Sequence, residues 1–243
     1  MKKILLYSGG MDSWLISQIW KPDLKIYIDM HTRYSNTERK KITENEKDVQ
    51  VIDFSLGQWE REDAIIPLRN LYLVMVACNI TGGEDVEICL GATAGDRVLD
   101  KSEGFKDRAN DLLNYLYQPQ HWLPQGKKVN INIDFKSKTK TELVKMYIEQ
   151  GGNIKDAFSR SFSCYNPING AECWECKPCF RKFVAFALNG MEFDENTVSK
   201  AINYIKREIY PEIQKGTYGR AEEEKEIKEV LKKYEKYIRN NSI

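Results

Sequence analysis

Residues 2–20 read KKILLYSGGMDSWLISQIW, and this stretch decides the fold. An apolar run at residues 4–7 leads into Ser8, Gly9 and Gly10, and the apolar residues that follow recur at helical spacing. Two adjacent glycines let the backbone approach an anion without a Cβ in the way, and the N–H groups at the start of a helix attract negative charge. The stretch therefore predicts a strand, a glycine turn and a helix, with a phosphate bound at the turn.

The motif Ser8-Gly9-Gly10-Met11-Asp12-Ser13 differs from both common nucleotide loops. No Gly-Lys-Ser/Thr closes the turn as in a P-loop, and the spacing is not the G-x-G-x-x-G of dinucleotide folds. At the end of a first strand, the motif resembles the pyrophosphate loop of the ATP pyrophosphatase (adenine nucleotide alpha hydrolase) superfamily. That resemblance implies that ATP is split between its α and β phosphates. The alternative is an ordinary strand-to-helix turn, in which Gly-Gly and a Ser or Asp cap are common.

Length and composition indicate a folded protein with small-molecule partners. The 243 residues suffice for one α/β domain with an appended element. Because the charges of 37 Lys and Arg nearly cancel those of 36 Asp and Glu, the chain has no large net positive charge that would attract nucleic acid. No apolar run approaches the ~18 residues of a membrane span, and Lys2-Lys3 is followed by too few apolar residues for a secretory signal. We therefore expect a cytoplasmic protein without a membrane partner.

Further strands are expected at residues 24–29, 49–53, 86–92 and 129–134, each short and either apolar or alternating. Helices are expected between them at residues 38–48, 71–77 and 110–117. Strands that alternate with helices through short links form right-handed parallel units. The sequence thus predicts an α/β fold, a parallel Rossmann-like sheet with helices on both faces.

Polar residues follow several of these strands, at the edge where open α/β sheets bind ligands. Asp29 ends the second strand and Arg33 follows it, and Gly91 lies near the end of the fourth. Arg69 and Asn70 come at the start of a buried helix, where a cation and an amide can meet phosphate. Two alternatives stay open, namely Arg33 as a solvated loop charge and Asn70 as a plain helix cap.

The connection at residues 93–108 reads TAGDRVLDKSEGFKDR and is unusually rich in charge. Its candidate substrate contacts are Asp96, Lys101, Asp107 and Arg108, which lie at or beyond the carboxyl end of the fourth strand. Ligands of open α/β sheets bind at this edge, so the connection is interpreted as a substrate loop. A solvated loop is the alternative.

Four of the six cysteines crowd into sixteen residues with the spacing C-x8-C-x2-C-x2-C. Zinc prefers four thiolates on a tetrahedron, and a C-x2-C turn delivers two of them from one knuckle. The cluster predicts a closed structural zinc site made by Cys164, Cys173, Cys176 and Cys179, rather than disulfides or scattered buried thiols. The two remaining cysteines are interpreted as small buried apolar residues.

The last third of the chain is predicted to be largely helical. Helices are expected from Lys138, with an N-cap at Thr139 or Thr141, and at residues 180–188, 194–209 and 221–239. The last helix has an apolar stripe that ends at Ile238. The expected organisation is an ATP-binding α/β domain at residues 1–160, a four-cysteine zinc-binding segment and helix at 161–190, and a C-terminal helical extension at 191–243.

A pyrophosphate loop at the start combined with the cysteine cluster near the end resembles the 7-cyano-7-deazaguanine (preQ0) synthase family of queuosine and deazaguanine biosynthesis. Weaker matches lie between them. Pro67-x-Arg69-Asn70 stands where the family has Pro-Gly-Arg-Asn, and the segment from Asp29 to Arg33 stands where it has Asp-Tyr-Gly-Gln-Arg-His. The start of the helix at residues 138–144 resembles the family's Lys-Thr/Ala-Glu segment.

The sequence differs from the family's motifs mostly at positions where the substrate would be recognised. Leu68 replaces a glycine, Tyr34 stands where the family has histidine, and the connection at residues 93–108 is longer than its counterpart. The chain after Gly190 also exceeds what the family leads us to expect.

The resemblance implies an ATP-dependent C–N ligase. Such an enzyme activates the carboxylate of 7-carboxy-7-deazaguanine as an acyl adenylate, lets ammonia displace AMP, and uses a second ATP to convert the amide into the nitrile. The resemblance implies ATP, Mg²⁺ and Zn²⁺ as cofactors and a homodimer as the assembly. The implied catalytic residues are Ser8, Asp12, Ser13 and Arg69; the implied cofactor contacts are Ser8, Gly9, Gly10, Met11, Asp12, Ser13, Asp29, Arg33, Arg69, Asn70 and Gly91.

Other functions stay open as alternatives. The enzyme could stop at 7-amido-7-deazaguanine or adenylate another carboxylate, including a protein terminus. A sulfur-transferring tRNA-modifying enzyme shares the nucleotide loop, but it needs a persulfide cysteine and a basic face that this sequence does not offer. A zinc-ribbon interaction protein would explain the cysteines without the motif at residues 8–13.

Overall fold

The computed structural model describes residues 1–235, and its contacts divide the chain into two compact units, Met1–Ser137 and Lys138–Ile243. The first unit contains the glycine turn, and the second contains the four clustered cysteines. The three-part division expected at residues 160 and 190 stays a prediction.

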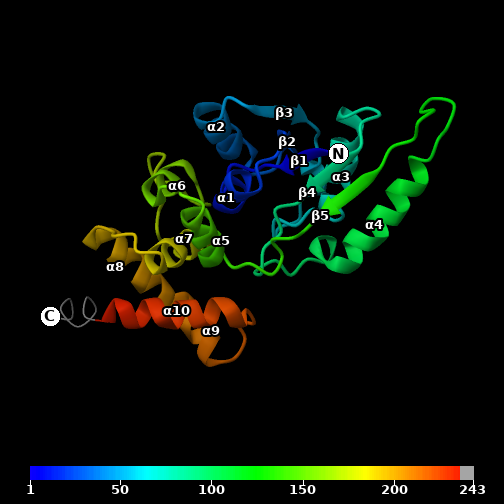
Figure 1. The fold of residues 1–243 in the computed structure, drawn as a ribbon. Helices are drawn as coiled ribbons and strands as arrows, with labels where there is room; N and C mark the ends of the chain where they lie inside the picture. The colour runs from blue at the N-terminus through cyan, green and yellow to red at the C-terminus, as the bar shows by residue number, and fades with distance from the viewer. Residues whose placement is uncertain (236–243) are drawn as a thin grey trace. The chain divides into compact units, whose positions relative to one another are not determined.

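The first unit is a parallel α/β fold (Figure 1). Its strands are β1 (Lys2–Leu6), β2 (Leu24–Asp29), β3 (Val49–Asp53), β4 (Val86–Cys89) and β5 (Val129–Asn132). They pair in the order β3-β2-β1-β4-β5, and each pairing is parallel. Between them lie α1 (Met11–Trp20), α2 (Ser35–Asn45), α3 (Arg69–Ile80) and α4 (Glu103–Leu116), with short 3-10 turns η1 (Gly57–Trp59) and η2 (Leu99–Lys101). The expected fold class is confirmed.

Helices cover both faces of this sheet because the chain changes direction at β1. Right-handed crossovers that run first towards β3 and then towards β5 place α1 and α2 on one face and α3 and α4 on the other. On the second face, Ile4 and Ile88 of the strands share one core with Val74 of α3 and Leu113 of α4. On the first face, α1 packs against β1.

The charged connection at residues 93–108 is not a loop throughout, as the sequence led us to expect. Its second half is the start of α4, which begins at Glu103 rather than near residue 110. The hydroxyl of Ser102 caps this helix by accepting the Phe105 N–H at 3.1 Å. Asp107 and Arg108 therefore lie on a helix, and only residues 93–102 form the connection that follows β4.

The second unit is helical over its regular parts. Its elements are α5 (Lys140–Glu149), α6 (Ile154–Arg160), α7 (Lys177–Leu188), α8 (Glu195–Tyr204), the π-turn η3 (Ile205–Ile209), α9 (Tyr210–Gln214) and α10 (Ala221–Lys233). The expected cap of α5 is confirmed, because Thr139 and Glu142 form a reciprocal capping box. Asp194 caps α8 as expected, by accepting the Thr197 N–H at 2.9 Å.

The two C-terminal helices differ in part from the prediction. The helix expected to stop before Pro211 continues through η3 into α9, which has Pro211 in its first turn. Pro211 lies in the first turn of α9, the helical position that proline most often occupies. The helix expected at residues 221–239 is observed as α10 up to Lys233, and residues 236–239, which include Ile238, lie outside the described residues.

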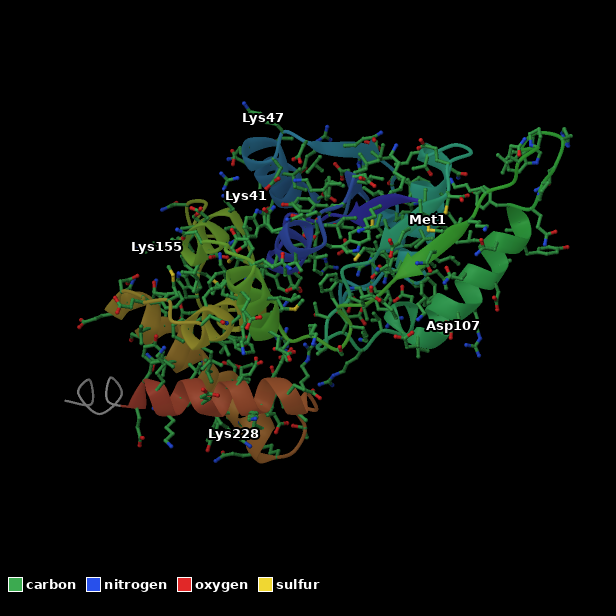
Figure 2. All side chains as sticks on the ribbon, in the orientation of Figure 1. Met1, Lys41, Lys47, Asp107, Lys155 and Lys228 are labelled. Atoms are coloured by element: carbon green, nitrogen blue, oxygen red, sulfur yellow. The ribbon has the colours of Figure 1, made fainter. Side chains whose placement is uncertain are left out.

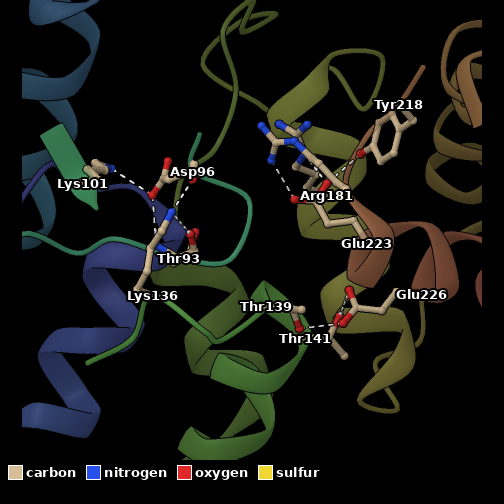
Figure 3. Close-up of polar contacts among 11 residues, drawn as sticks. Thr93, Asp96, Lys101, Lys136, Thr139, Thr141, Arg181, Tyr218, Glu223 and Glu226 are labelled. Atoms are coloured by element: carbon tan, nitrogen blue, oxygen red, sulfur yellow. Dashed lines mark hydrogen bonds and ion pairs between the residues drawn. The ribbon is translucent and has the colours of Figure 1, made fainter. Parts of the chain in front are cut away.

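Polar contacts attach α10 to α5 and α7 within the second unit (Figure 3). Glu226 accepts hydrogen bonds from the hydroxyls of Thr139, at 2.6 Å, and Thr141, at 2.7 Å. Glu223 pairs with Arg181 at 3.0 Å and accepts the Tyr218 hydroxyl at 2.6 Å. Ile227 and Val230 on the same helix are buried in the core that α7 and α8 share. The extension is therefore a packed part of the second unit.

Among the described residues, no helix combines the length and apolar character that a membrane crossing requires.

The buried ammonium of Lys127 donates hydrogen bonds to groups at the C-terminal end of α3, and this contact provides a test of what stabilises the first unit. Lys127 is 4% exposed, and its Nζ donates to the carbonyls of Cys78 (2.6 Å) and Gly82 (2.8 Å) and to the Thr81 hydroxyl (2.7 Å). Lys127→Met would leave these acceptors without the donor, so we expect the free energy of unfolding to fall by about 2–4 kcal/mol. Urea denaturation measures the change.

The neighbouring Lys128 supplies the control. It is exposed, so Lys128→Met should change the free energy of unfolding by no more than about 0.5 kcal/mol. Equal effects of the two substitutions would contradict the anchoring role of Lys127.

Candidate functional site

The glycine turn joins β1 to the first turn of α1. Gly9 has φ +71°, and a Cβ there would lie 3.0 Å from Cγ1 of Ile42, so a larger residue would be strained and crowded. The N–H of Ser8 donates to Oγ of Ser13 at 3.3 Å, and that hydroxyl donates to the carbonyl of Gly10 at 3.1 Å. No side chain caps the start of α1, which leaves its N-terminus suited to an anion.

A cavity of about 240 Å³ opens at the carboxyl edge of the sheet, beside this turn. Its apolar wall comes from the ends of β1, β2 and β4 and from α3, and consists of Leu6, Ile26, Ile28, Met30, Leu73 and Leu90. Its polar and charged side chains are Tyr7, Ser8, Asp12, Ser13, Tyr27, Glu38, Arg69, Asn70 and Lys101. An apolar wall suits a flat heterocycle, and the charged part suits phosphates. The cavity sits where the strand order reverses, the place at which such sheets bind nucleotides.

Several predicted site residues line this cavity together. They are Ser8, Asp12, Ser13, Arg69, Asn70, Gly91 and Lys101, which come from the turn after β1, the start of α3, the end of β4 and η2. Gly9, Gly10 and Met11 shape the turn itself and do not line the cavity. The fold thus brings the turn and the start of α3 together at one edge of the sheet, although β2 and β3 lie between them in the sequence.

Asn70 presents a buried amide to the cavity. The residue is 4% exposed, and nothing in the described part of the chain accepts a hydrogen bond from its Nδ2. Its backbone N–H donates to the carboxylate of Asp100 at 3.2 Å, so the start of α3 is already capped from another segment. Buried donors are rarely left unpaired, and the amide of Asn70 is therefore available to a ligand.

The segment after β4 holds Lys101 at the cavity (Figure 3). The ammonium of Lys101 pairs with Asp96 at 3.0 Å, and the same carboxylate accepts the Thr93 N–H at 2.9 Å. Lys136, which follows β5, donates to the carbonyls of Thr93 and Asp96. These contacts fix the connection without regular secondary structure. Asp96 acts on the cavity through Lys101, since it does not line the cavity itself.

Other predicted site residues lie away from the cavity lining. Asp29 is buried and pairs with Arg39 at 3.2 Å. The guanidinium of Arg33 pairs with Glu60 at 2.9 Å and donates to two backbone carbonyls of the neighbouring loop. Arg33 therefore has a structural contact of its own, and its predicted role in cofactor binding stays a prediction.

Asp107 and Arg108, predicted as substrate contacts, also lie outside the lining of the cavity. Asp107 projects from the outer surface of α4 with its side chain 68% exposed (Figure 2). Arg108 is exposed and donates to the carbonyl of Gly104 one turn earlier. Their predicted roles in substrate binding stay predictions.

Sequence reasoning missed three side chains in the cavity, Tyr7, Tyr27 and Glu38. Burial raises the pKa of both tyrosines, so both phenols stay protonated at neutral pH. The Tyr27 hydroxyl donates to a carboxylate oxygen of Glu38 at 3.3 Å. Tyr7 and Tyr27 had one sequence signal, their place near the carboxyl ends of β1 and β2, whereas Glu38 lies on α2 and had none.

The second unit contains the candidate metal centre. The Sγ atoms of Cys164, Cys173, Cys176 and Cys179 all lie within 4.8 Å of one another, and all four residues are buried. Cys173 and Cys179 have their sulfurs 3.9 Å apart, far too long for a disulfide and close to the ~3.8 Å edge of a tetrahedron with 2.3 Å Zn–S bonds. The donor set and its spacing fit zinc with no open position.

Backbone and charged contacts support the cysteine loop. The Cys173 N–H points at Sγ of Cys164 at 3.3 Å, as is favourable for a thiolate. Glu172 pairs at 2.9 Å with Lys182, which is 1% exposed, and accepts the Ser163 N–H at 2.7 Å. Lys182 also donates to carbonyls at the end of α6. These contacts hold the loop in place on both sides of Cys164, at Ser163 and at Glu172.

Loss of one thiolate should release the metal. We expect Cys176→Ser to lower bound zinc from one ion per chain to near zero and to lower the melting temperature, because metal binding and folding of such loops are coupled. Metal analysis of the purified protein and thermal denaturation measure both. Cys78→Ala, which removes a thiol of the first unit, should leave the zinc content unchanged; a loss of zinc there would contradict the assignment.

The residue before Arg69 has an unusual backbone. Leu68 has φ +59° and a side chain that is 60% exposed, at the position where the resemblance leads us to expect the glycine of Pro-Gly-Arg-Asn. A left-handed conformation costs a non-glycine residue about 1–2 kcal/mol. The family's glycine would adopt it without strain.

Leu68→Gly is therefore expected to raise the free energy of unfolding by about 0.5–1 kcal/mol, after the greater freedom of glycine in the unfolded chain is subtracted. Chemical denaturation measures it. Leu99→Gly is the matched control, because Leu99 is 84% exposed and has no positive φ, and there glycine should destabilise by about 0.5–1 kcal/mol. Destabilisation by both substitutions would show that the positive φ of Leu68 does not reduce the free energy of unfolding.

Comparison with known proteins agrees with this geometry. The chain is 24% identical to 7-cyano-7-deazaguanine synthase 1 of Colwellia psychrerythraea over 235 residues, covering 84% of this chain and 98% of that protein. It is 24% identical to the 7-cyano-7-deazaguanine synthase of Psychromonas ingrahamii over 226 residues, covering 79% and 95%. Residues 41–190, which include Arg69, Asn70 and the four clustered cysteines, match the family described as "Queuosine biosynthesis protein QueC". With more than half of its length in that match, the chain belongs to the QueC family.

Proposed function

We propose that this protein is an ATP-dependent 7-cyano-7-deazaguanine synthase. It converts 7-carboxy-7-deazaguanine and ammonia to the nitrile through an acyl adenylate and an amide, and it releases AMP and pyrophosphate at each of two activations. The observation that carries the proposal is one cavity in which the turn at residues 8–13 meets Arg69 and Asn70 beside an apolar wall. Its membership of the QueC family supports the same activity.

The cavity residues take their roles from charge and position. Ser8, Ser13 and the N-terminus of α1 hold the phosphates that leave as pyrophosphate. Arg69 adds a fixed cation that stabilises the charge developing on the phosphates. The carboxylate of Asp12 is a hard oxygen donor suited to Mg²⁺, which would offset phosphate charge when bound. No side-chain nucleophile is needed, because the carboxylate oxygen of the substrate attacks the α-phosphorus.

The remaining parts have supporting roles. Lys101, held by Asp96, lies in the cavity and would attract the carboxylate of the substrate. The apolar wall of Ile26, Ile28 and Leu73 would contact the adenine ring. The four-cysteine centre has no open position and would hold zinc as a structural ion. We further propose a homodimer in the cytoplasm, where ATP and the deazaguanine precursor are available.

Product analysis tests the function directly. The zinc-loaded protein is incubated with 7-carboxy-7-deazaguanine, ammonium and Mg-ATP, and products and nucleotides are measured by mass spectrometry. Nitrile with two AMP per product is expected. Amide with one AMP would mean that the enzyme stops halfway. Absence of both products with ATP still bound would overturn the proposed substrate, and absence of ATP binding would overturn the enzyme.

Arg69 should matter more than other arginines of the first unit. We expect Arg69→Ala to lower kcat/KM by about 10²–10³-fold, because a fixed cation aimed at developing negative charge contributes mainly in the transition state. Arg61→Ala is the control. Its side chain is 65% exposed and pairs only with Asp63 among the described ion pairs, so kcat/KM should stay within about twofold. Similar losses in both variants would contradict the role given to Arg69.

A further inference from the structure

A carboxyl group in the cavity has no part in the roles described so far. Glu38 projects from α2 into the lining, on the opposite side of the sheet from α3. The Tyr27 hydroxyl donates to its Oε2 at 3.3 Å and reaches the carbonyl of Ser35 at 3.4 Å. This contact holds one oxygen of the carboxyl in place. Glu38 is partly buried, and among the described residues no ion pair joins it to a Lys or Arg.

Charges around this carboxyl come from three elements. Asp29 of β2 lies close by with its own carboxylate paired to Arg39 of α2, and Arg69 of α3 lines the same cavity and interacts electrostatically with Glu38. Burial raises the pKa of Glu38 to about 7; Tyr27 and Arg69 hold it down, and Asp29 adds to the rise. The group therefore exchanges a proton near neutral pH, as an efficient general base does.

The proposed reaction needs such a group. Each time AMP leaves, the nitrogen bonded to the reacting carbon must lose a proton. The usual base, an imidazole, is missing from the cavity: His31 is paired with Asp53 at 2.9 Å, and neither it nor His121, the two histidines of the chain, lines the cavity. The phenols of Tyr7 and Tyr27 stay protonated near neutrality.

We propose that Glu38 is the general base of this site and accepts the proton of the substrate nitrogen when AMP leaves. This inference rests on the proposed function and adds a catalytic residue to it. The Tyr27 hydroxyl positions the carboxyl, and Arg69 keeps the carboxylate form accessible in a partly buried place.

The proton transfers balance in both nitrogen steps. In the first, the lone pair of ammonia forms a C–N bond to the adenylated carbonyl carbon, the C–O bond to AMP breaks with its electron pair on AMP, and one N–H proton passes to the Glu38 carboxylate. In the second, the amide oxygen bonds to the α-phosphorus as pyrophosphate leaves, and the resulting iminium loses one N–H proton to water. The neutral imidate then loses its last N–H proton to Glu38, the C=N bond becomes triple, and the C–O bond to AMP breaks with its electron pair on AMP. The carboxylic acid then returns its proton to water.

The second step gives the cleaner test because it uses no ammonia, whose own ionisation would distort a pH profile. With 7-amido-7-deazaguanine and saturating Mg-ATP, kcat of the full-length wild-type protein should rise with pH through about 7 and then level off, as the carboxylate form of Glu38 increases. Glu38→Gln should lower kcat by about 10²–10⁴-fold and abolish the rise of kcat with pH. Exchange of pyrophosphate into ATP with the carboxylate substrate needs no base and should stay within about threefold.

A matched variant and a direct titration complete the experiment. Glu44→Gln changes a carboxyl of the same helix whose side chain is 49% exposed, and it should keep the wild-type profile. Carbon-13 NMR of labelled glutamate carboxyls, with the Glu38 signal identified by its loss in Glu38→Gln, should titrate near pH 7.

The outcomes separate the two proposals. A wild-type protein that forms neither amide nor nitrile would overturn the proposed function. Wild-type turnover with an unchanged rate and pH profile in Glu38→Gln, or a Glu38 signal that titrates near pH 4.5, would overturn the role of Glu38 and leave the function intact.

Discussion

The candidate site depends on one constraint, the reversal of strand order at β1. β1 pairs with β2 on one side and with β4 on the other. The connections that follow β2 and β4 therefore run to opposite faces of the sheet and separate at its carboxyl edge. The cavity opens between them. Gly9 makes the geometry possible, since its positive φ turns the chain from β1 into α1 at a point where Ile42 leaves no space for a Cβ. The phosphate-binding end of α1 and the start of α3 face one cavity for this reason.

Lysines, two of them buried, rather than regular secondary structure, hold irregular segments within each of the two units. Lys127 ends α3, Lys136 ties the connection after β4, and Lys182 ties the chain that precedes the cysteines. Each ammonium donates to backbone carbonyls, which would otherwise be unsatisfied away from water. A buried ammonium is costly without several acceptors, so Lys127 and Lys182 also specify the path of the chain around them. Irregular segments of both units are thereby ordered without forming helices or strands.

Local signals explain what the sequence predicted. Short apolar runs identified all five strands of the first unit, and cysteine spacing identified the cluster, because both depend on residues a few positions apart. The start of α4 was missed because the Ser102 cap lies within a run of charge that is also typical of a loop. Glu38 and Lys136 escaped notice for another reason: their roles arise from partners on other elements, and no local pattern marks a polar residue that folding brings to a cavity.

Two positions at which the resemblance leads us to expect glycine have a left-handed backbone in this chain although their residues carry side chains. His31 has φ +56° at the position of the glycine in Asp-Tyr-Gly-Gln-Arg-His, as Leu68 has φ +59° at the glycine of Pro-Gly-Arg-Asn. Each left-handed residue costs about 1–2 kcal/mol, so neighbouring contacts must impose the conformation. At His31 they do: its N–H donates to Asp29, and Gly57 packs so closely that a Cβ would lie 2.1 Å from its carbonyl oxygen. Arg69 and Asn70 line the cavity directly after the left-handed Leu68, so the turn that positions them does not require a glycine.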